Sequence, residues 1–353
     1  MKKYFLAMLV TLIISGFAGC AGEAVIEQVP PVENDTDVIY NYADYERPEE
    51  IENEIGNETA FATIRVAAMR GPTAMGLLYL MDKSERGQVQ NDYEFELLGS
   101  PDLVPPLLVQ GEVDIAVVPG NLAAVLYNRL DVQALAVVTL GVLHIVDTTG
   151  EINSVEDLRG RTIYMHGQGI TPEIALNYVL EKNGLIPGED VFVEFRAEHA
   201  EIAALLGSGQ AEVALLPEPF VSTVLAQIEG LRVALDLSEE WNRVQPDYGL
   251  IMSVVIARRE FLEENPDAVA IFMQEYAASV AFVNQNVPAA AEFAVEFDLV
   301  PAPHIAESAI PRSNIVFIAG DEMRENLMGF YRVLYDANPE LVGGNLPSDE
   351  FFW

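Results

Sequence analysis

A ten-residue segment that occurs twice constrains the fold of this chain more than any other feature. Gln110–Pro119 (QGEVDIAVVP) recurs 98 residues later as Ser208–Pro217 (SGQAEVALLP), and each copy follows a pair of leucines. Each copy is a short apolar run that ends in proline before a helix-like stretch, which is typical of a buried strand. The repeat indicates that the folded body is built from two similar halves.

The repeat extends upstream of these two segments. The β-like runs Ile64–Met69 and Thr162–Met165 are each followed by a glycine-containing loop. Apolar residues at i, i+3 and i+4 spacing then predict helices at 74–83 and 172–183. Each half therefore reads strand, loop, helix, strand, helix, short strand and helix. This alternation predicts an α/β protein of two lobes, each a mainly parallel sheet flanked by helices, with a cleft between the lobes at the carboxyl ends of the strands.

The N-terminus is predicted to be an export signal that ends in a lipidation site. Two lysines precede the almost wholly apolar run Tyr4–Phe17, as in secretory signals. The run continues Ala-Gly-Cys, and Cys20 is the only cysteine of the chain. This end resembles the lipobox of bacterial lipoproteins, in which the cysteine is acylated, although Phe17 stands where leucine is usual. Ordinary cleavage near Ala21 is the alternative.

The segment after the signal is strongly acidic. Residues 21–60 contain twelve acidic residues, one arginine and three prolines, so they cannot bury enough apolar surface to fold and their charges repel one another. The length of 353 residues favours two domains in the remainder. The predicted domains are a lipoprotein signal peptide at 1–19, an acidic disordered tether at 20–60, a first lobe at 61–142 to which the helices of 258–353 mainly return, and a second lobe at 143–257 that includes the hinge crossings at 133–147 and 250–257.

Composition excludes several functions. Acidic residues outnumber basic ones 55 to 19, which gives a net charge of −36 and argues against nucleic acid as a partner. A lone cysteine at position 20 leaves the folded body without disulfides, cysteine-ligated zinc or a cysteine nucleophile. The four histidines are mostly separated by tens of residues, and no HExxH sequence occurs. We therefore predict no catalytic residues, no metal site and no cofactor.

Four segments carry a family resemblance. Ile152–Arg161 (INSVEDLRGR) resembles the pattern I-x-S-x-x-D-L-x-G-K, with Arg161 at the place of the final lysine. Gly111–Asn121 looks like G-E-x-D-x-A-x-x-P, Leu215–Pro219 looks like x-x-P-E-P, and Gly343–Phe352 is similar to a tail found in one branch of the family. In this order they resemble the solute-binding proteins of ABC transporters of the nitrate, sulfonate, taurine and thiamine-precursor class. The resemblance covers roughly residues 62–353. It implies the type II fold of periplasmic binding proteins and the capture of a small solute for an ABC permease.

The candidate ligand contacts lie in loops that follow strands, where helix N-termini offer free N–H groups and a partial positive charge to an oxygen-rich or anionic ligand. Structural roles are the alternatives: glycines for turns, threonines for helix caps, and an acidic first turn at Glu218. Arg70 and His166 each directly precede a glycine loop, and with Arg196 and His199 they are candidates for holding an anion. The predicted ligand-binding residues are Arg70, Gly71, Pro72, Thr73, Ser100, Gly120, Asn121, His166, Gly167, Gln168, Gly169, Thr171, Glu218 and Tyr248, and Tyr164, Trp241 and Phe317 are further aromatic candidates.

These features predict a monomeric solute receptor, lipid-anchored outside the bacterial cell membrane, that closes its lobes on a small organic molecule. The ligand class stays open between a nitrate- or alkyl-sulfonate-type anion and a planar heterocycle such as a thiamine-precursor pyrimidine. The scarcity of clustered arginines favours the uncharged or heteroaromatic class. The alternatives are an enzyme on the same fold and a sensory lipoprotein without a role in transport.

Overall fold

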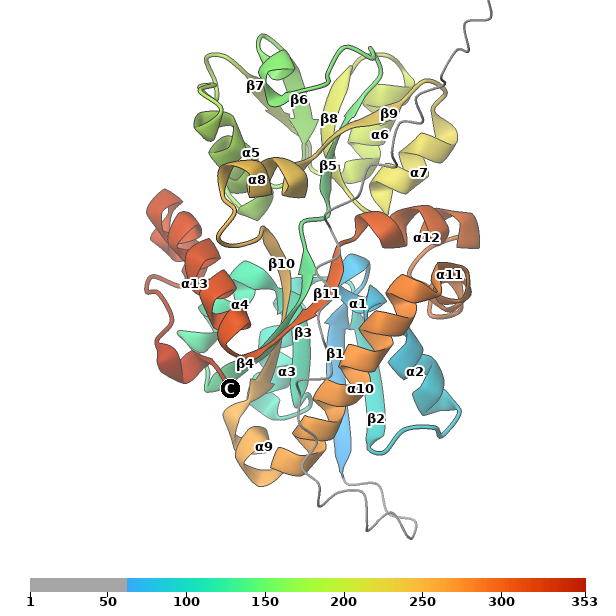
Figure 1. The fold of residues 1–353 in the computed structure, drawn as a ribbon, viewed down its shortest axis with the longest axis vertical. Coiled ribbons are helices and arrows are strands. Elements are labelled where there is room, and N and C mark those ends of the chain that lie inside the picture. The colour runs from blue at the N-terminus through green and yellow to red at the C-terminus, as the bar shows by residue number, and fades with distance from the viewer. Residues whose placement is uncertain (1–61) are drawn as a thin grey trace, which may run out of the picture. The chain divides into compact units, whose positions relative to one another are not determined.

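Two β-sheets, each covered by helices, organise the part of the chain that the computed structural model describes, residues 62–353 (Figure 1). We call the elements of the six-stranded sheet and its helices the first lobe, and those of the five-stranded sheet the second lobe. Cys20 and the segments predicted at 1–60 lie outside the described residues. In sheet order, the first lobe has β2 (Asp92–Leu98), β1 (Thr63–Met69), β3 (Ile115–Pro119), β10 (Ile251–Arg258), β4 (Val132–Leu140) and β11 (Ile315–Ile318), and the second lobe has β7 (Phe192–Phe195), β6 (Thr162–Met165), β8 (Val213–Pro217), β5 (Leu143–Asp147) and β9 (Arg232–Asp236).

The repeat predicted from the sequence corresponds to the same order of elements in both lobes. The strands β2, β1 and β3 are parallel neighbours, and so are β7, β6 and β8. In each lobe the third parallel strand then pairs with an antiparallel strand, β10 or β5. Each sheet is therefore mixed rather than mainly parallel, because β10 and β5, the strands by which the chain enters each lobe from the other, run against the repeated ones.

The chain crosses between the sheets twice. The first crossing joins β4 to β5 through Gly141 and Val142, and the second leaves β9 and reaches β10 by way of α8 (Leu237–Val244). The two crossings lie close together, because a Cβ atom added at Gly141 would stand 1.9 Å from Ser238 Oγ. The run near 250–257, expected at a crossing, pairs along its length with β3 and β4 in the first sheet.

Helices cover both sheets and bury the apolar strands. The residues of β3 and β8 are buried up to their last apolar position, as expected for strands covered on both faces. In the first lobe the helices are α1 (Pro72–Met75), α2 (Leu78–Glu85), α3 (Val104–Gln110), α4 (Gly120–Tyr127), α9 (Arg259–Glu264), α10 (Pro266–Gln285), α11 (Val287–Glu296), α12 (Pro303–Ala309) and α13 (Gly320–Ala337), and in the second lobe they are α5 (Thr171–Lys182), α6 (His199–Gly207), α7 (Phe220–Gln227) and α8.

The C-terminal part of the chain returns to the first lobe. The helix α10 packs against α2 and β11, and α13 packs against α4. The final residues add to the same lobe, since Phe351 packs against Tyr127 and Tyr331 and Phe352 bridges to Ala134 in β4. No helix among residues 62–353 combines the length and the apolar character needed to cross a bilayer.

Candidate functional site

The carboxyl end of β8 faces the first lobe. Glu218 directly follows this strand, and its Oε1 accepts a hydrogen bond of 2.6 Å from Nε of Arg312. Arg312 ends the short 3-10 helix η5 (Ile310–Arg312), which follows α12 in the first lobe. The end of β8 therefore contacts the first lobe at this point, through a 3-10 helix and not through a strand end of that lobe.

Glu218 forms part of a polar contact between the lobes. Its side chain is fully buried, and its Oε2 accepts hydrogen bonds from N and Oγ of Ser222 at 3.1 and 2.8 Å. Nη2 of Arg312 donates to the same Ser222 Oγ at 2.9 Å, and Nε2 of His144 lies 3.2 Å from the carbonyl oxygen of Arg312. Both carboxylate oxygens are thus engaged by protein groups, where the sequence predicted a ligand contact. We call the contact between Glu218 and Arg312, with the Ser222 hydroxyl that both of them bind, the inter-lobe ion pair.

A second contact between the lobes is apolar. Trp241 of α8 is fully buried, with its ring centroid 6.2 Å from that of Phe330 in α13 and 4.6 Å from that of Tyr178 in α5. The indole Nε1 donates to the carbonyl oxygen of Tyr248 at 2.9 Å. Trp241 is therefore a core residue at the junction of the lobes, and its ring is inaccessible to a ligand.

Tyr248, another predicted ligand contact, lies beside this junction. Its ring rests on Gly329 of α13, where an added Cβ atom would stand 2.2 Å from Cδ1. Burial, followed by the neighbouring Tyr178, raises the pKa of the Tyr248 hydroxyl to about 12. The phenol is consequently neutral at physiological pH and can act as a hydrogen-bond donor.

The predicted residues of the first lobe occupy the loops after its parallel strands. Gly71, with φ of 102°, precedes α1, in which Pro72 takes the first position. Thr73 Oγ1 accepts a hydrogen bond of 3.1 Å from Ser253 Oγ. The guanidinium of Arg70 is exposed and donates to the carbonyl oxygen of Asp298 at 2.9 Å. These residues adjoin one another, and Arg70 is already paired.

The other predicted residues of the first lobe follow β2 and β3. The carbonyl oxygen of Gly120 accepts a hydrogen bond of 2.9 Å from the hydroxyl of Tyr331, while Asn121 is half-buried in the first turn of α4. The Ser100 hydroxyl donates to Asp102 in the next turn. Ser100 therefore takes part in a local turn contact, and Gly120 helps to fix α4 to α13.

In the second lobe the loop between β6 and α5 has a backbone that glycine favours. Gly167 and Gly169 have φ angles of 99° and 74°, and Gln168 between them is exposed. Thr171 begins α5 and is buried, and its hydroxyl has no hydrogen-bond partner among the described residues. A buried hydroxyl without a partner costs about 1–3 kcal/mol, which a ligand or water oxygen at the N-terminus of α5 would offset.

Two imidazole rings and one phenyl ring form a cluster at the ends of β6, β7 and β8. The ring centroids of His166 and His199 are 4.9 Å apart, and His199 stacks on Phe220 at 4.5 Å with an interplanar angle of 18°. Burial lowers the pKa of His199 to about 4, with a smaller contribution from His166. We call these three side chains the ring cluster; the His199 ring is neutral at physiological pH.

Phe220 was not among the predicted residues. It directly follows the segment Leu215–Pro219, and its side chain is 41% exposed. Two further large apolar side chains are similarly exposed after strand ends, Leu103 (45%) after β2 and Ile170 (44%) after β6. All three lie on loops that follow strand ends, where open α/β sheets bind their ligands. The sequence feature that points to Phe220 is an aromatic residue directly after the segment Leu215–Pro219.

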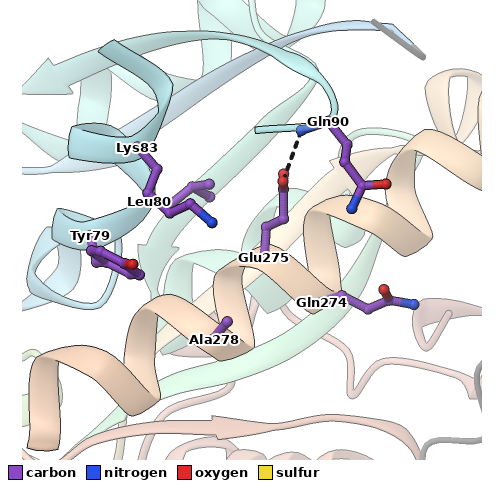
Figure 2. Close-up of a pocket in the computed structure, with 7 residues that line it drawn as sticks. All are labelled: Tyr79, Leu80, Lys83, Gln90, Gln274, Glu275 and Ala278. Carbon is purple, nitrogen blue, oxygen red and sulfur yellow. Dashed lines mark hydrogen bonds between the residues drawn. The ribbon is translucent and has the colours of Figure 1, made fainter. Parts of the chain in front are cut away.

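Two cavities lie elsewhere on the described part of the chain. The smaller, of about 150 Å³, lies between α2 and α10, where Gln90 N donates to Glu275 Oε1 at 2.9 Å (Figure 2). The larger, of about 310 Å³, lies beside the amino ends of β6 and β8. Of the residues predicted to contact ligand, the aromatic candidate Tyr164 lines the larger cavity, and the smaller cavity has none of them. Residues 62–353 bring no three His, Cys, Asp or Glu side chains together in a group fit to hold a metal ion.

Comparison with known proteins agrees with this architecture. Residues 93–240 match the family model described as ABC transporter, phosphonate, periplasmic substrate-binding protein. An ABC transporter structure from Parabacteroides distasonis is 25% identical, with a TM-score of 0.70 over 82% of this chain and 98% of that chain. The periplasmic aliphatic sulphonate binding protein SsuA from Escherichia coli is 17% identical, with a TM-score of 0.66 over 83% and 97%. No curated protein matches the chain by sequence.

The fold and the family match together define the class. The chain has the two-sheet α/β fold of type II periplasmic binding proteins. Residues 93–240 match the family of periplasmic phosphonate-binding proteins of ABC transporters, and structures of sulphonate- and nitrate-binding proteins share the fold. The resemblance predicted from the sequence is confirmed.

Proposed function

We propose that this protein captures one small organic solute outside the cytoplasm, between its two lobes, and delivers it to an ABC permease. The observation that carries the proposal is the opposition of the lobes at the end of β8, where Glu218 meets Arg312. A ligand that contacts both lobes favours the closed arrangement by the difference in its affinity for the two states.

We infer that the solute is planar and at least partly apolar. The ring cluster offers an exposed phenyl face at Phe220 beside a neutral His199, and such a surface stacks on a flat ring. The arginines predicted to hold an anion are already paired, Arg70 with Asp298 and Arg196 with Glu194. A heterocycle of the thiamine-precursor type meets these conditions. The positions of the solute contacts stay a prediction.

The second candidate ligand is an oxyanion of the sulfonate or phosphonate type. The names of the matched family model and of the sulphonate-binding relative favour it. The oxyanion class is also supported by the exposed glycine loop before α5 and by the Thr171 hydroxyl, which has no hydrogen-bond partner among the described residues. The free N–H groups at a helix N-terminus donate hydrogen bonds to anionic oxygens.

A thermal-shift screen with both ligand classes tests the proposal, because a ligand that binds only the native state raises the melting temperature. We expect a pyrimidine-type heterocycle to stabilise the protein and Phe220→Ala to weaken its binding by roughly tenfold, as one lost stacking contact of ~1.4 kcal/mol requires. Phe192→Ala is the matched control, because Phe192 is 46% exposed on the edge strand β7. Stabilisation by sulfonates alone, with no effect of Phe220→Ala, would instead establish the oxyanion class.

We also propose that Cys20 is acylated and anchors the protein to the bacterial membrane, on the support of its lipobox-like sequence. Replacement of Cys20 by alanine should move the protein from the membrane fraction to the soluble fraction of cells. An unchanged distribution would show that the anchor is not attached at this cysteine.

A further inference from the structure

The repeated lobes differ at one corresponding position. In the first lobe, Asp114 precedes β3 and is 1% exposed on its side chain. Arg65 of β1 holds it, with Nη2 at 2.6 Å from Oδ1 and Nε at 2.8 Å from Oδ2. Arg258, at the end of β10, adds Nη2 at 2.8 Å from Oδ1. Two guanidinium groups therefore fill the space beside this acid.

Glu212 is the counterpart of Asp114 in the second lobe. Both precede the repeated strand, and the register makes their neighbours correspond as well. Val66 pairs with Ile115 in the first lobe and Ile163 pairs with Val213 in the second, so Thr162 takes the place of Arg65.

The second guanidinium is replaced by threonine too. The amide nitrogen of Arg258 donates to the carbonyl oxygen of Asp114, and that of Thr148 donates to the carbonyl oxygen of Glu212. Both guanidinium groups of the first lobe thus correspond to short hydroxyl side chains in the second.

The larger cavity, of about 310 Å³, lies where those groups are missing. Thr162, Gly209 and Glu212 are among its lining residues, with Gln210 and Tyr164. The neighbouring glycines show the same difference. The nearest side-chain atom to a Cβ atom added at Gly111 is Nη1 of Arg258, whereas nothing lies within 4 Å of one added at Gly209.

The charged side chains that line the cavity are Glu212 and Arg161. Glu212 is 62% exposed on its side chain, and its contact with a cation is a single distance of 3.4 Å to Nη1 of Arg161. Arg161 is shared with Glu151. Two carboxylates therefore depend on one guanidinium, in a chain whose net charge is −36. The Tyr164 ring of the lining already carries a cation, since the guanidinium carbon of Arg196 lies 5.0 Å from its centroid.

We propose that this cavity, which we call the amino-end pocket, is a docking site for an arginine side chain of a partner protein. A guanidinium bound there would pair with Glu212 as Arg65 pairs with Asp114, and it could donate to the carbonyl oxygens of Gly209 and Ala211. In the first lobe, Arg65 and Arg258 donate to the corresponding carbonyl oxygens of Gly111 and Val113. The pocket lies at the ends of β6 and β8 opposite to those that face the first lobe, so a partner can occupy it independently of the proposed solute.

The test uses capped arginine as the probe, because N-acetyl-arginine methylamide reproduces an arginine within a protein segment. Amide NMR signals of 160–164 and 209–213 should shift on titration with this compound and should not shift with the citrulline analogue, which has the same shape without the charge. Absence of the shift at millimolar concentrations overturns the proposal. Tighter binding of free arginine than of the capped form also overturns it, since that result would mark a small-molecule site.

Two variants test whether the NMR shifts arise at the amino-end pocket. Glu212→Gln should abolish the shifts, and Thr162→Arg should fill the pocket from within, abolish the shifts and raise the melting temperature. The matched controls are Glu229→Gln and Gln227→Arg, which change the same charges at exposed positions of the second lobe and should leave the shifts intact. An undiminished response in folded Thr162→Arg, confirmed by its thermal unfolding, contradicts the proposal.

Discussion

Replacement of Arg312 by methionine is the most informative perturbation of the relation between the lobes. The variant removes the cation that holds Glu218 and leaves a fully buried carboxylate, which keeps only the two hydrogen bonds from Ser222. Removing one partner of a fully buried ion pair costs about 3–5 kcal/mol. Arg312 is 32% exposed, so solvent screens part of the interaction, and we expect a loss of ~1–3 kcal/mol.

The loss of this interaction has two possible consequences. Either the native state is destabilised by that amount, or the lobes separate and water reaches Glu218. Urea unfolding measures the first and small-angle scattering measures the second, as a larger radius of gyration. Glu218→Gln in the same background should recover most of the loss, because a neutral amide needs no counter-charge.

Arg324→Met is the matched control, since Arg324 pairs with Asp349 at 3.2 Å on the exposed surface of the first lobe. It should cost no more than ~1 kcal/mol. If Arg312→Met changes neither the unfolding free energy nor the scattering profile beyond this control, the inter-lobe ion pair does not stabilise the arrangement of the lobes.

Three further predictions concern stability. The pKa of His199 is lowered to about 4, so the unfolded state binds a proton at a higher pH than the native state does. The free energy of unfolding should therefore decrease between pH 6.5 and 4 by ~1–3 kcal/mol more in the unmodified protein than in His199→Gln. Parallel pH profiles of the two proteins would refute this. Asp114→Asn should cost ~3–5 kcal/mol in urea unfolding, because Arg65 and Arg258 lose their shared carboxylate, whereas Asp131→Asn, at an exposed pair with Arg259, should cost at most ~1 kcal/mol. Gly329→Ala should cost ~1–3 kcal/mol because the new methyl group displaces the Tyr248 ring, while Gly207→Ala, with only ordinary contacts to Ile228, should change stability by less than ~1 kcal/mol; equal effects of the two would argue against the packing of Tyr248.

The periodic features of the sequence predicted much of the fold. Apolar strands that end in Pro119 and Pro217 and glycine loops before helices are local signals, and the structure places them as equivalent elements of two lobes. The antiparallel pairing of β10 with β3 and of β5 with β8 was not predicted. That pairing depends on contacts between distant segments, which the periodicity of either strand does not record.

The candidate site was less predictable because it depends on which side chains meet across the lobes. Glu218 follows a strand end as expected, yet its partner Arg312 lies 94 residues away in a segment without a distinguishing pattern. Trp241 was a stacking candidate by residue type, and only its burial against Phe330 shows that it belongs to the core. The stacking of His199 on Phe220 likewise joins two elements whose proximity follows from the sheet order.

Closure of the lobes on a solute is the central claim, and an electron–electron distance between two spin labels tests it most directly. Val109→Cys in the first lobe and Ile186→Cys in the second, both exposed, supply the labelling sites once Cys20, the only native cysteine, is replaced by serine. With a solute that raises the melting temperature, the distance distribution should shift and narrow to a single population. A distribution that is unchanged at saturating solute would contradict the claim.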